Sequence, residues 1–272
     1  MSDHDISIDE KRVYADRAAT ESLLVGTDRG LASVAVSGDK IGEFALLTTT
    51  EVRDVAAYEG TVAVADREDV RVGNAEGFAE TGFGDATAVG YDDGTLIAAG
   101  PEGRVAAYDG ESWNARGMAP EARHADGPLL ATVEGVYRVT DDDVTYSGLD
   151  DARDVSRAGP WAATADGLYR LGNGWLDERE GDATAVDARA DHVVAVLDDT
   201  LYEYDGDDWR AREVPLSDVA AVAYSESALY AVDAQGTVAV DAGDGWRTRT
   251  IGLPGVSAVA VTESAQGADG NA

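Results

Sequence analysis

The stretch "YDGDDWRAREV", residues 204–214, places a Gly-Asp-Asp turn between a short apolar segment and a tryptophan. Gly206 stands three residues before Trp209, and this spacing recurs elsewhere in the chain. The pairs that share it are Gly110/Trp113, Gly172/Trp175, Gly206/Trp209 and Gly243/Trp246. A motif that returns at intervals of tens of residues indicates a repeat architecture in which each copy forms the same small unit.

Each repeat unit around this motif is predicted to contain four short strands. The first is small and apolar, as in "DVAAY" 54–58, and the second follows a turn, as in "TVAVAD" 61–66. Val55 and Val62 are seven residues apart, as are their equivalents in other units, which indicates a hairpin of constant turn length. The third strand leads into the Gly-x-x-Trp hairpin, and the fourth is more polar, as an outer edge should be. The first strands are centred at residues 55, 89, 125, 155, 186, 222 and 259.

The two ends of the chain leave complementary gaps in this pattern. Residues 23–48 supply a second, third and fourth strand without a first, whereas 256–262 forms a first strand with no blade after it. A closed ring satisfies both ends, so we predict an all-β fold, a seven-bladed β-propeller of four-stranded antiparallel blades. The segment "EKRVYADR", 10–17, is an alternative closing strand, but 256–262 matches the other first strands better.

The whole chain, 1–272, is therefore expected to form one domain. Its ordered core is predicted over about 10–262, with flexible tails at 1–9 and 263–272. The tryptophans of the repeated hairpin are predicted to be structural and to pack against the neighbouring blade. These residues are Trp113, Trp175, Trp209 and Trp246.

The chain is strongly acidic, with 53 Asp and Glu residues against 21 Lys and Arg, a net charge of −32. Lys11 and Lys40 are its lysines, and its apolar residues are mostly small. This composition is similar to that of proteins from salt-loving archaea, in which molar salt shortens the Debye length to ~3 Å and screens the repulsion. Because Lys and Arg form no cluster, we expect no nucleic-acid partner.

Further limits come from what the sequence lacks. It has no cysteine, which excludes disulfides and thiolate chemistry. The segment "MSDHDISIDEKRVYADR", 1–17, lacks the basic and apolar regions of a signal peptide. No later apolar run is long enough to span a membrane. We therefore expect a monomeric cytoplasmic protein with no membrane partner.

Particular segments are similar to a known group of proteins. The repeated strand units, the acidic "IDEKRVYADR" at 8–17 and "IGEFALL" at 41–47 resemble an uncharacterised haloarchaeal β-propeller family. The resemblance extends from about Ile8 to Val261. It implies a propeller in a haloarchaeal cytoplasm, and because it carries no activity it assigns no functional residues.

Catalytic and metal-binding patterns are not evident. His4, His124 and His192 stand in no metal-binding or catalytic-triad motif. Acidic runs such as 141–143 and 205–208 lie in turns, where Asp accepts local backbone hydrogen bonds, and none has the spacing of a calcium loop. We therefore predict no catalytic residue, no metal and no cofactor, and a protein that is not an enzyme.

An arginine recurs near the start of three predicted inner strands, and it is the candidate binding feature. "EVRDV" 51–55, "EARHA" 121–125 and "DARDV" 151–155 share one frame, which places Arg53, Arg123 and Arg153 around one mouth of the channel, with His124 beside them. Convergent arginines bind carboxylate or phosphate groups through paired hydrogen bonds. The alternative is that each arginine forms an ion pair with the adjacent acid, Glu51, Glu121 or Asp151.

Three functions follow from this pattern. The first is a non-enzymatic binding or interaction scaffold whose channel face engages a protein partner. The second is a propeller that binds a small anionic ligand, or a hydrolase that uses the arginines at the channel mouth. The third is a purely structural protein without a defined site.

Overall fold

The computed structural model describes residues 20–263, which form seven antiparallel sheets of four strands each. Blade 1 contains β28 (Ala258–Glu263), β1 (Thr20–Thr27), β2 (Gly30–Ser37) and β3 (Lys40–Leu46), and blade 2 contains β4 (Asp54–Tyr58), β5 (Thr61–Ala65), β6 (Val70–Asn74) and β7 (Gly77–Glu80). Blade 3 contains β8 (Ala88–Asp92), β9 (Thr95–Ala99), β10 (Arg104–Tyr108) and β11 (Trp113–Met118), and blade 4 contains β12 (Ala122–Asp126), β13 (Leu129–Thr132), β14 (Gly135–Val139) and β15 (Val144–Gly148). Blade 5 contains β16 (Ala152–Ser156), β17 (Trp161–Thr164), β18 (Gly167–Leu171) and β19 (Trp175–Glu180), and blade 6 contains β20 (Ala183–Arg189), β21 (His192–Leu197), β22 (Thr200–Tyr204) and β23 (Trp209–Ala211). Blade 7 contains β24 (Val219–Tyr224), β25 (Leu229–Asp233), β26 (Thr237–Asp241) and β27 (Arg247–Thr250).

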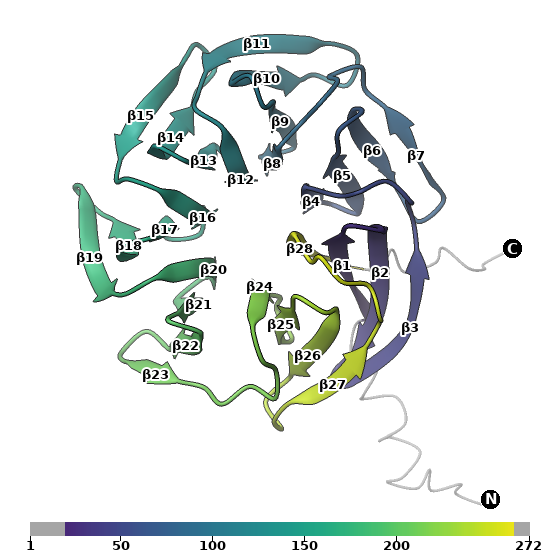
Figure 1. Cartoon of the computed structure of the whole chain (residues 1–272), viewed down its shortest axis with the longest axis vertical. Helices are drawn as coiled ribbons and strands as arrows, with labels where there is room; N and C mark the ends of the chain where they lie inside the picture. Colours follow the sequence, from purple (N-terminus) through teal and green to yellow (C-terminus); the bar gives the residue numbers. More distant parts are fainter. Residues whose placement is uncertain (1–19, 264–272) are drawn as a thin grey trace, which may run out of the picture.

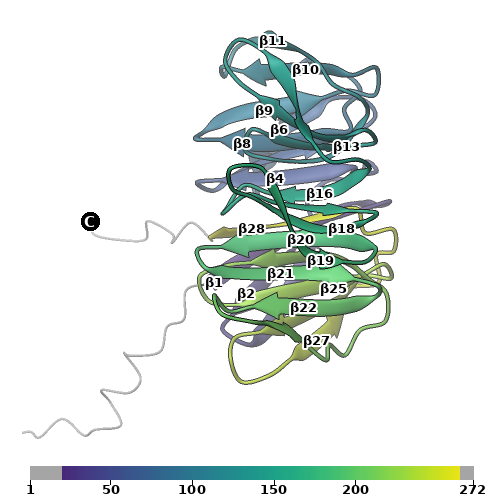
Figure 2. The same cartoon turned by 90° about the vertical axis from the view of Figure 1, so that its left-hand side faces the viewer.

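The blades form a ring around a central axis, so the predicted seven-bladed propeller is confirmed (Figure 1). The first strand of each blade lies innermost and the fourth lies at the rim. Seen from the side, strands such as β20, β21 and β22 run across the thickness of the disc (Figure 2). The inner strands therefore start on one face of the disc and end on the other, and residues at equivalent positions lie at similar depths along the axis.

The ring closes through β28, which pairs antiparallel with β1 from Gly26 opposite Ala258 to Glu21 opposite Glu263. The predicted closing segment 256–262 thus supplies the inner strand of blade 1, and Glu263, predicted to lie in a tail, is the last residue of that strand. The alternative closing segment 10–17, the predicted tail 1–9 and the rest of the predicted tail 263–272 lie outside the described residues.

The constant spacing predicted one length for the turn between the first and second strands. In the structure the length of this turn differs between blades. In blade 2, Tyr58 pairs with Thr61, and the two turn residues Glu59 and Gly60 have φ of 46° and 80°. Two successive positive φ values are those of the tight hairpin whose twist matches that of the flanking strands. In blade 5 the turn is longer, and Ser156 pairs with Trp161.

The core lies between neighbouring blades and consists mainly of small residues. Between blades 2 and 3, Ala63, Val70, Val89 and Ala98 are buried with Phe83. Sheets packed face to face need thin side chains near the axis, where the blades converge, and this explains the abundance of Ala and Val.

The hairpin tryptophans are half-buried and lie against the cores between blades. The indole N–H of Trp113 donates to the carbonyl of Thr81 at 3.2 Å, and that of Trp175 donates to the carbonyl of Ser147 at 2.9 Å, in each case on the preceding blade. The indole nitrogen of Trp209 is buried without a partner among residues 20–263, and Trp246 packs against the core between blades 6 and 7. Trp161, which lies outside the repeated motif, is the most buried of the five at 3% exposed.

Candidate functional site

The inner strands surround a cavity of about 340 Å³ on the channel axis. Because side chains alternate along a strand, the residue before each central valine or alanine and the residue after it lie on the same side of the strand. The preceding position holds Asp54, His124 and Asp154 in blades 2, 4 and 5, and the following position holds Asp126, Ser156 and Asp187 in blades 4, 5 and 6. Blades 2, 4, 5 and 6 therefore contribute polar groups at these positions, whereas blades 1, 3 and 7 contribute only Ala and Gly.

The three candidate arginines lie at the starts of their inner strands, and each contacts an aspartate of the next blade. Arg53 forms an ion pair with Asp85 at 2.7 Å and also donates to the carbonyl of Ala86. Arg123 repeats this arrangement with Asp151 at 2.6 Å and the carbonyl of Ala152. Arg153 contacts Asp182 at 2.5 Å. Each guanidinium thus links its own blade, through an ion pair, to the residues just before the inner strand of the next blade.

These contacts differ from the local ion pairs weighed in the sequence analysis. Glu51, the acid next to Arg53, contacts Arg67 instead. The acid that contacts each arginine lies about 30 residues further along the chain. It occupies, in the next repeat, the position that Glu51 occupies in the repeat of Arg53. Arg123, His124 and Arg153 line the central cavity together, whereas Arg53 is not among the residues that line it.

His124 lies between two carboxylates. Its Nδ1 is 2.8 Å from Asp54 Oδ1, and its Nε2 is 3.6 Å from Asp154 Oδ1. Burial alone lowers the pKa of His124, but Asp54 and Asp154 outweigh it and raise that pKa to about 10. The imidazole is therefore a fixed cation at neutral pH, and both of its nitrogens face carboxylates.

The inner-strand aspartates also join successive blades through the backbone. Asp54 accepts from the amides of Val89 in blade 3, at 2.9 Å, and Ala125 in blade 4, at 3.3 Å. Asp154 accepts from the amide of Val186 at 2.8 Å. Burial raises the pKa of Asp154, and His124 offsets part of that rise.

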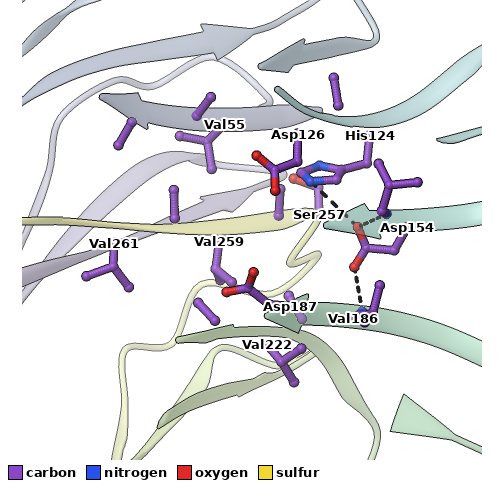
Figure 3. Close-up of a pocket in the computed structure, with 18 of the residues that line it drawn as sticks. Val55, His124, Asp126, Asp154, Val186, Asp187, Val222, Ser257, Val259 and Val261 are labelled. Atoms are coloured by element: carbon purple, nitrogen blue, oxygen red, sulfur yellow. Dashed lines mark hydrogen bonds and ion pairs between the residues drawn. The ribbon is translucent and has the colours of Figure 1, made fainter. Parts of the chain in front are cut away.

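Asp187 makes the equivalent connection one step further around the ring. It accepts from the amide of Tyr224 at 2.7 Å and from the hydroxyl of Ser156 at 3.2 Å. Burial, together with the nearby carboxylates of Asp126 and Asp154, raises the pKa of Asp187 to about 7. The side chains of His124, Asp126, Asp154 and Asp187 extend from β12, β16 and β20 toward the same cavity (Figure 3).

These aspartates were not predicted from the sequence as site residues. A signal for them was present, because Asp54 and Asp154 occupy the same position, directly before the central valine, in the first strands of two repeats. An acidic residue in a buried strand needs hydrogen-bond donors or a cation, and the next blade supplies them here.

A second cavity, of about 430 Å³, lies between blades 6 and 7. The hydroxyl of Tyr224 donates to Glu203 at 2.6 Å, and Arg212 contacts both Glu203 and Asp241. Burial and the neighbouring Glu203 raise the pKa of Tyr224 above its ordinary value. The charged groups of this cavity therefore satisfy one another, so the channel cavity is the better candidate site.

The serine hydroxyls nearest the channel cavity donate to groups other than His124. The hydroxyl of Ser257 donates to the carbonyl of Val52 at 2.8 Å, and that of Ser156 donates to Asp187.

Within residues 20–263, no three acidic or histidine side chains are placed to hold a metal ion, and no helix could cross a membrane. His192 is exposed with its ring centroid 6.3 Å from that of Tyr224, and His4 lies outside the described residues.

The sequence matches the family model of the HVO_0234-like beta propellers over residues 7–262. The chain belongs to this family. Membership in a β-propeller family, which the strand units had suggested, is thereby confirmed, whereas the haloarchaeal setting stays a prediction. No curated protein matches this HVO_0234-like propeller significantly.

Solved structures with a similar fold are distant in sequence. The HVO_0234-like propeller superposes on the WD40 β-propeller domain of Doa1 with a TM-score of 0.65 at 15% identity, covering 89% of this chain and 88% of that one. For the computationally designed Ika8 protein the TM-score is 0.61 at 15% identity, with 90% and 91% covered. For YCF48 bound to D1 peptide the TM-score is 0.56 at 12% identity, with 78% and 92% covered. At these identities the similarity shows the fold alone.

Proposed function

We propose that this propeller is a non-enzymatic binding scaffold whose channel face engages a protein partner. The observation that carries the proposal is the construction of the channel cavity, whose wall is fixed by contacts between blades. Arg123 and Arg153 are held by aspartates of the next blade, and His124 is held between Asp54 and Asp154. A rigid concave site loses little conformational entropy on binding, which favours recognition.

The size of the cavity limits what can enter it. A volume of about 340 Å³ is at the lower end of small-ligand sites and suits one or two side chains of a partner rather than a folded domain. The propeller YCF48, similar to this chain in fold, has been solved with a peptide bound. A partner segment that inserts a side chain into the channel is the corresponding arrangement here.

A variant that blocks the channel mouth tests this proposal. Thr184 is exposed, lines the cavity and occupies the same position in its repeat as the three arginines. Thr184→Trp therefore narrows the mouth, and it removes no side-chain hydrogen bond found within residues 20–263. Leu176→Trp, on the exposed outer strand β19, is the matched control. Partners captured by the wild type would be identified by mass spectrometry and their affinities measured with purified proteins. We expect Thr184→Trp to weaken binding at least tenfold and Leu176→Trp to leave it unchanged. Equal binding by both variants would contradict the proposal.

Binding of a small anion, with or without hydrolysis, is a second candidate, and one observation favours it. The side chains of Arg123 and Arg153 remain 37% and 30% exposed and line the cavity, so each keeps donors beyond its ion pair. Titration of phosphate into the wild type and into Arg123→Ala tests it, because only a site at this mouth would lose affinity in the variant. The cytoplasmic location, the salt-rich setting and the monomeric state stay predictions.

A further inference from the structure

The acidic groups of the channel outnumber the cations that neutralise them. Asp54, Asp126, Asp154 and Asp187 lie around or beside the cavity, and His124 contacts Asp54 and Asp154. Asp126 and Asp187 form no ion pair within residues 20–263; they accept hydrogen bonds, Asp126 from the amide of Arg157 and Asp187 from the groups described above. Two carboxylates thus face the cavity without a cation.

The arginines of the cavity wall do not supply the missing charge. Arg123 and Arg153 form ion pairs with Asp151 and Asp182, which lie outside the wall. Arg157 lies 3.7 Å from Asp92 and 3.6 Å from Asp93, again outside the wall. Each guanidinium is therefore balanced by an acid of its own, and the excess inside the channel remains negative.

Two tyrosines at the other end of the inner strands line the same cavity. The rings of Tyr58 and Tyr91 are 5.8 Å apart between centroids. The side chain of Tyr91 is 9% exposed, and its hydroxyl, like that of Tyr58, forms no hydrogen bond within residues 20–263. Neither hydroxyl is among the buried polar atoms of these residues that lack a partner, so both oxygens are accessible and can hydrogen-bond to a bound ligand. Tyrosine ring faces also attract organic cations.

We propose that the channel cavity binds a single organic cation, an alkylammonium or guanidinium group, between the carboxylates of Asp126 and Asp187 and the tyrosine pair Tyr58 and Tyr91. Carboxylates bind guanidinium through charge-assisted hydrogen bonds, and the aromatic wall suits its flat apolar faces. The carrier of this group is a lysine or arginine side chain of the protein partner, and this assignment of the carrier rests on the function proposed above. A metal ion is a poorer fit, since the described residues offer no set of three ligands.

The raised pKa of Asp187 agrees with a negative site that lacks its counter-charge. The groups that face Asp187 are Asp126 on β12, Asp154 and Ser156 on β16, and Tyr224 on β24, with His124, Arg123, Arg153 and Arg157 elsewhere in the wall. A bound cation favours the ionised form of Asp187 and so lowers its pKa. Binding at pH 7 should therefore release protons, and affinity should rise between pH 6 and pH 8.

The direct test is calorimetric titration with n-butylguanidinium, with the neutral n-butylurea as the matched probe, at constant ionic strength. We expect saturable one-to-one binding of the cation alone, with proton release at pH 7 measured in two buffers of different ionisation enthalpy. Asp126→Asn, which keeps an acceptor for the amide of Arg157, should weaken binding at least tenfold. Asp141→Asn removes one charge from a side chain that is 98% exposed and should leave affinity unchanged.

Some outcomes would overturn the inference. Equal affinity for butylguanidinium and butylurea would show that the cavity does not recognise positive charge. Equal effects of Asp126→Asn and Asp141→Asn would show that the cation is attracted only by the overall negative charge of the protein. Asp187→Asn is a weaker test because Asp187 also joins blades, so Asp126→Asn decides if Asp187→Asn does not fold.

The two proposals fail in different ways. If Thr184→Trp abolishes partner binding, Asp126→Asn leaves it unchanged and butylguanidinium neither binds nor competes, the cation site is wrong and the scaffold stands. If butylguanidinium binds as expected but no partner binding depends on Thr184, the site takes a free small cation and the scaffold proposal is wrong.

Discussion

Nδ1 of His124, in β12, lies 2.8 Å from Oδ1 of Asp54, in β4, although blade 3 separates the two strands in the ring. The intervening inner strand β8 permits this approach because it carries Ala88 and Gly90 near the axis. A Cβ added to Gly90 would lie only 2.9 Å from the carbonyl oxygen of Ala125. The small residues of β8 thus allow blade 4 to contact blade 2.

Replacement of His124 should be costly because Asp54 is completely buried. His124→Gln leaves that carboxylate without its cation, and we expect the free energy of unfolding in urea to fall by about 3–5 kcal/mol. His192→Gln, at an exposed position, serves as the control and should have almost no effect. Adding Asp54→Asn to His124→Gln should recover part of the loss. A single variant as stable as the wild type would show that Asp54 is satisfied by its backbone donors alone.

The same contact predicts a dependence of stability on alkaline pH. The pKa of His124 rises from 6.5 to about 10 on folding, so its stabilising effect is complete below pH 6.5 and is lost as pH rises through 10. Unfolding free energies measured from pH 6.5 to 10 should therefore fall for the wild type. The slope should be smaller in His124→Gln, whereas parallel slopes would contradict the raised pKa. The difference between the two proteins removes the contribution of tyrosines that titrate in the same range.

The blades could be predicted from the sequence because their signals are local. Turn residues, alternating strands and the Gly-x-x-Trp spacing all act within one repeat, and the unfilled first blade indicated closure by the last strand. The partners of the candidate arginines could not be found in this way. Asp85, which contacts Arg53, lies 32 residues further along the chain, and only the packing of blades brings the two together. The contact between His124 and Asp54 was less predictable still, since it crosses a whole blade and depends on Gly90.

The ion pairs between arginine and the next blade should each contribute modestly to stability. Arg53→Ala removes a partly exposed ion pair with Asp85 and a hydrogen bond to the carbonyl of Ala86, and we expect a loss of about 1 kcal/mol. Arg210→Ala is the control, because Arg210 is 65% exposed and contacts Asp205 within its own hairpin. It should cost less than about 0.5 kcal/mol. Equal losses in urea denaturation would mean that the contact between blades adds nothing beyond an ordinary surface pair.

Closure of the ring by β28 provides the most direct test of the architecture. Val259 and Val261 of β28 pair with Val25 and Leu23 of β1, and both pack against the core between blades 7 and 1. A chain that ends at residue 257 loses this strand, opens the ring and exposes the edge of β1. We expect its melting temperature to fall by about 10–20 °C, as a loss of roughly 5 kcal/mol would produce in a chain of this size. A chain that ends at Glu263 keeps β28 and is the matched control, with unchanged melting expected. If the shorter chain melted like the control, β28 would not be required for closure, and the segment 10–17 would be the better closing strand.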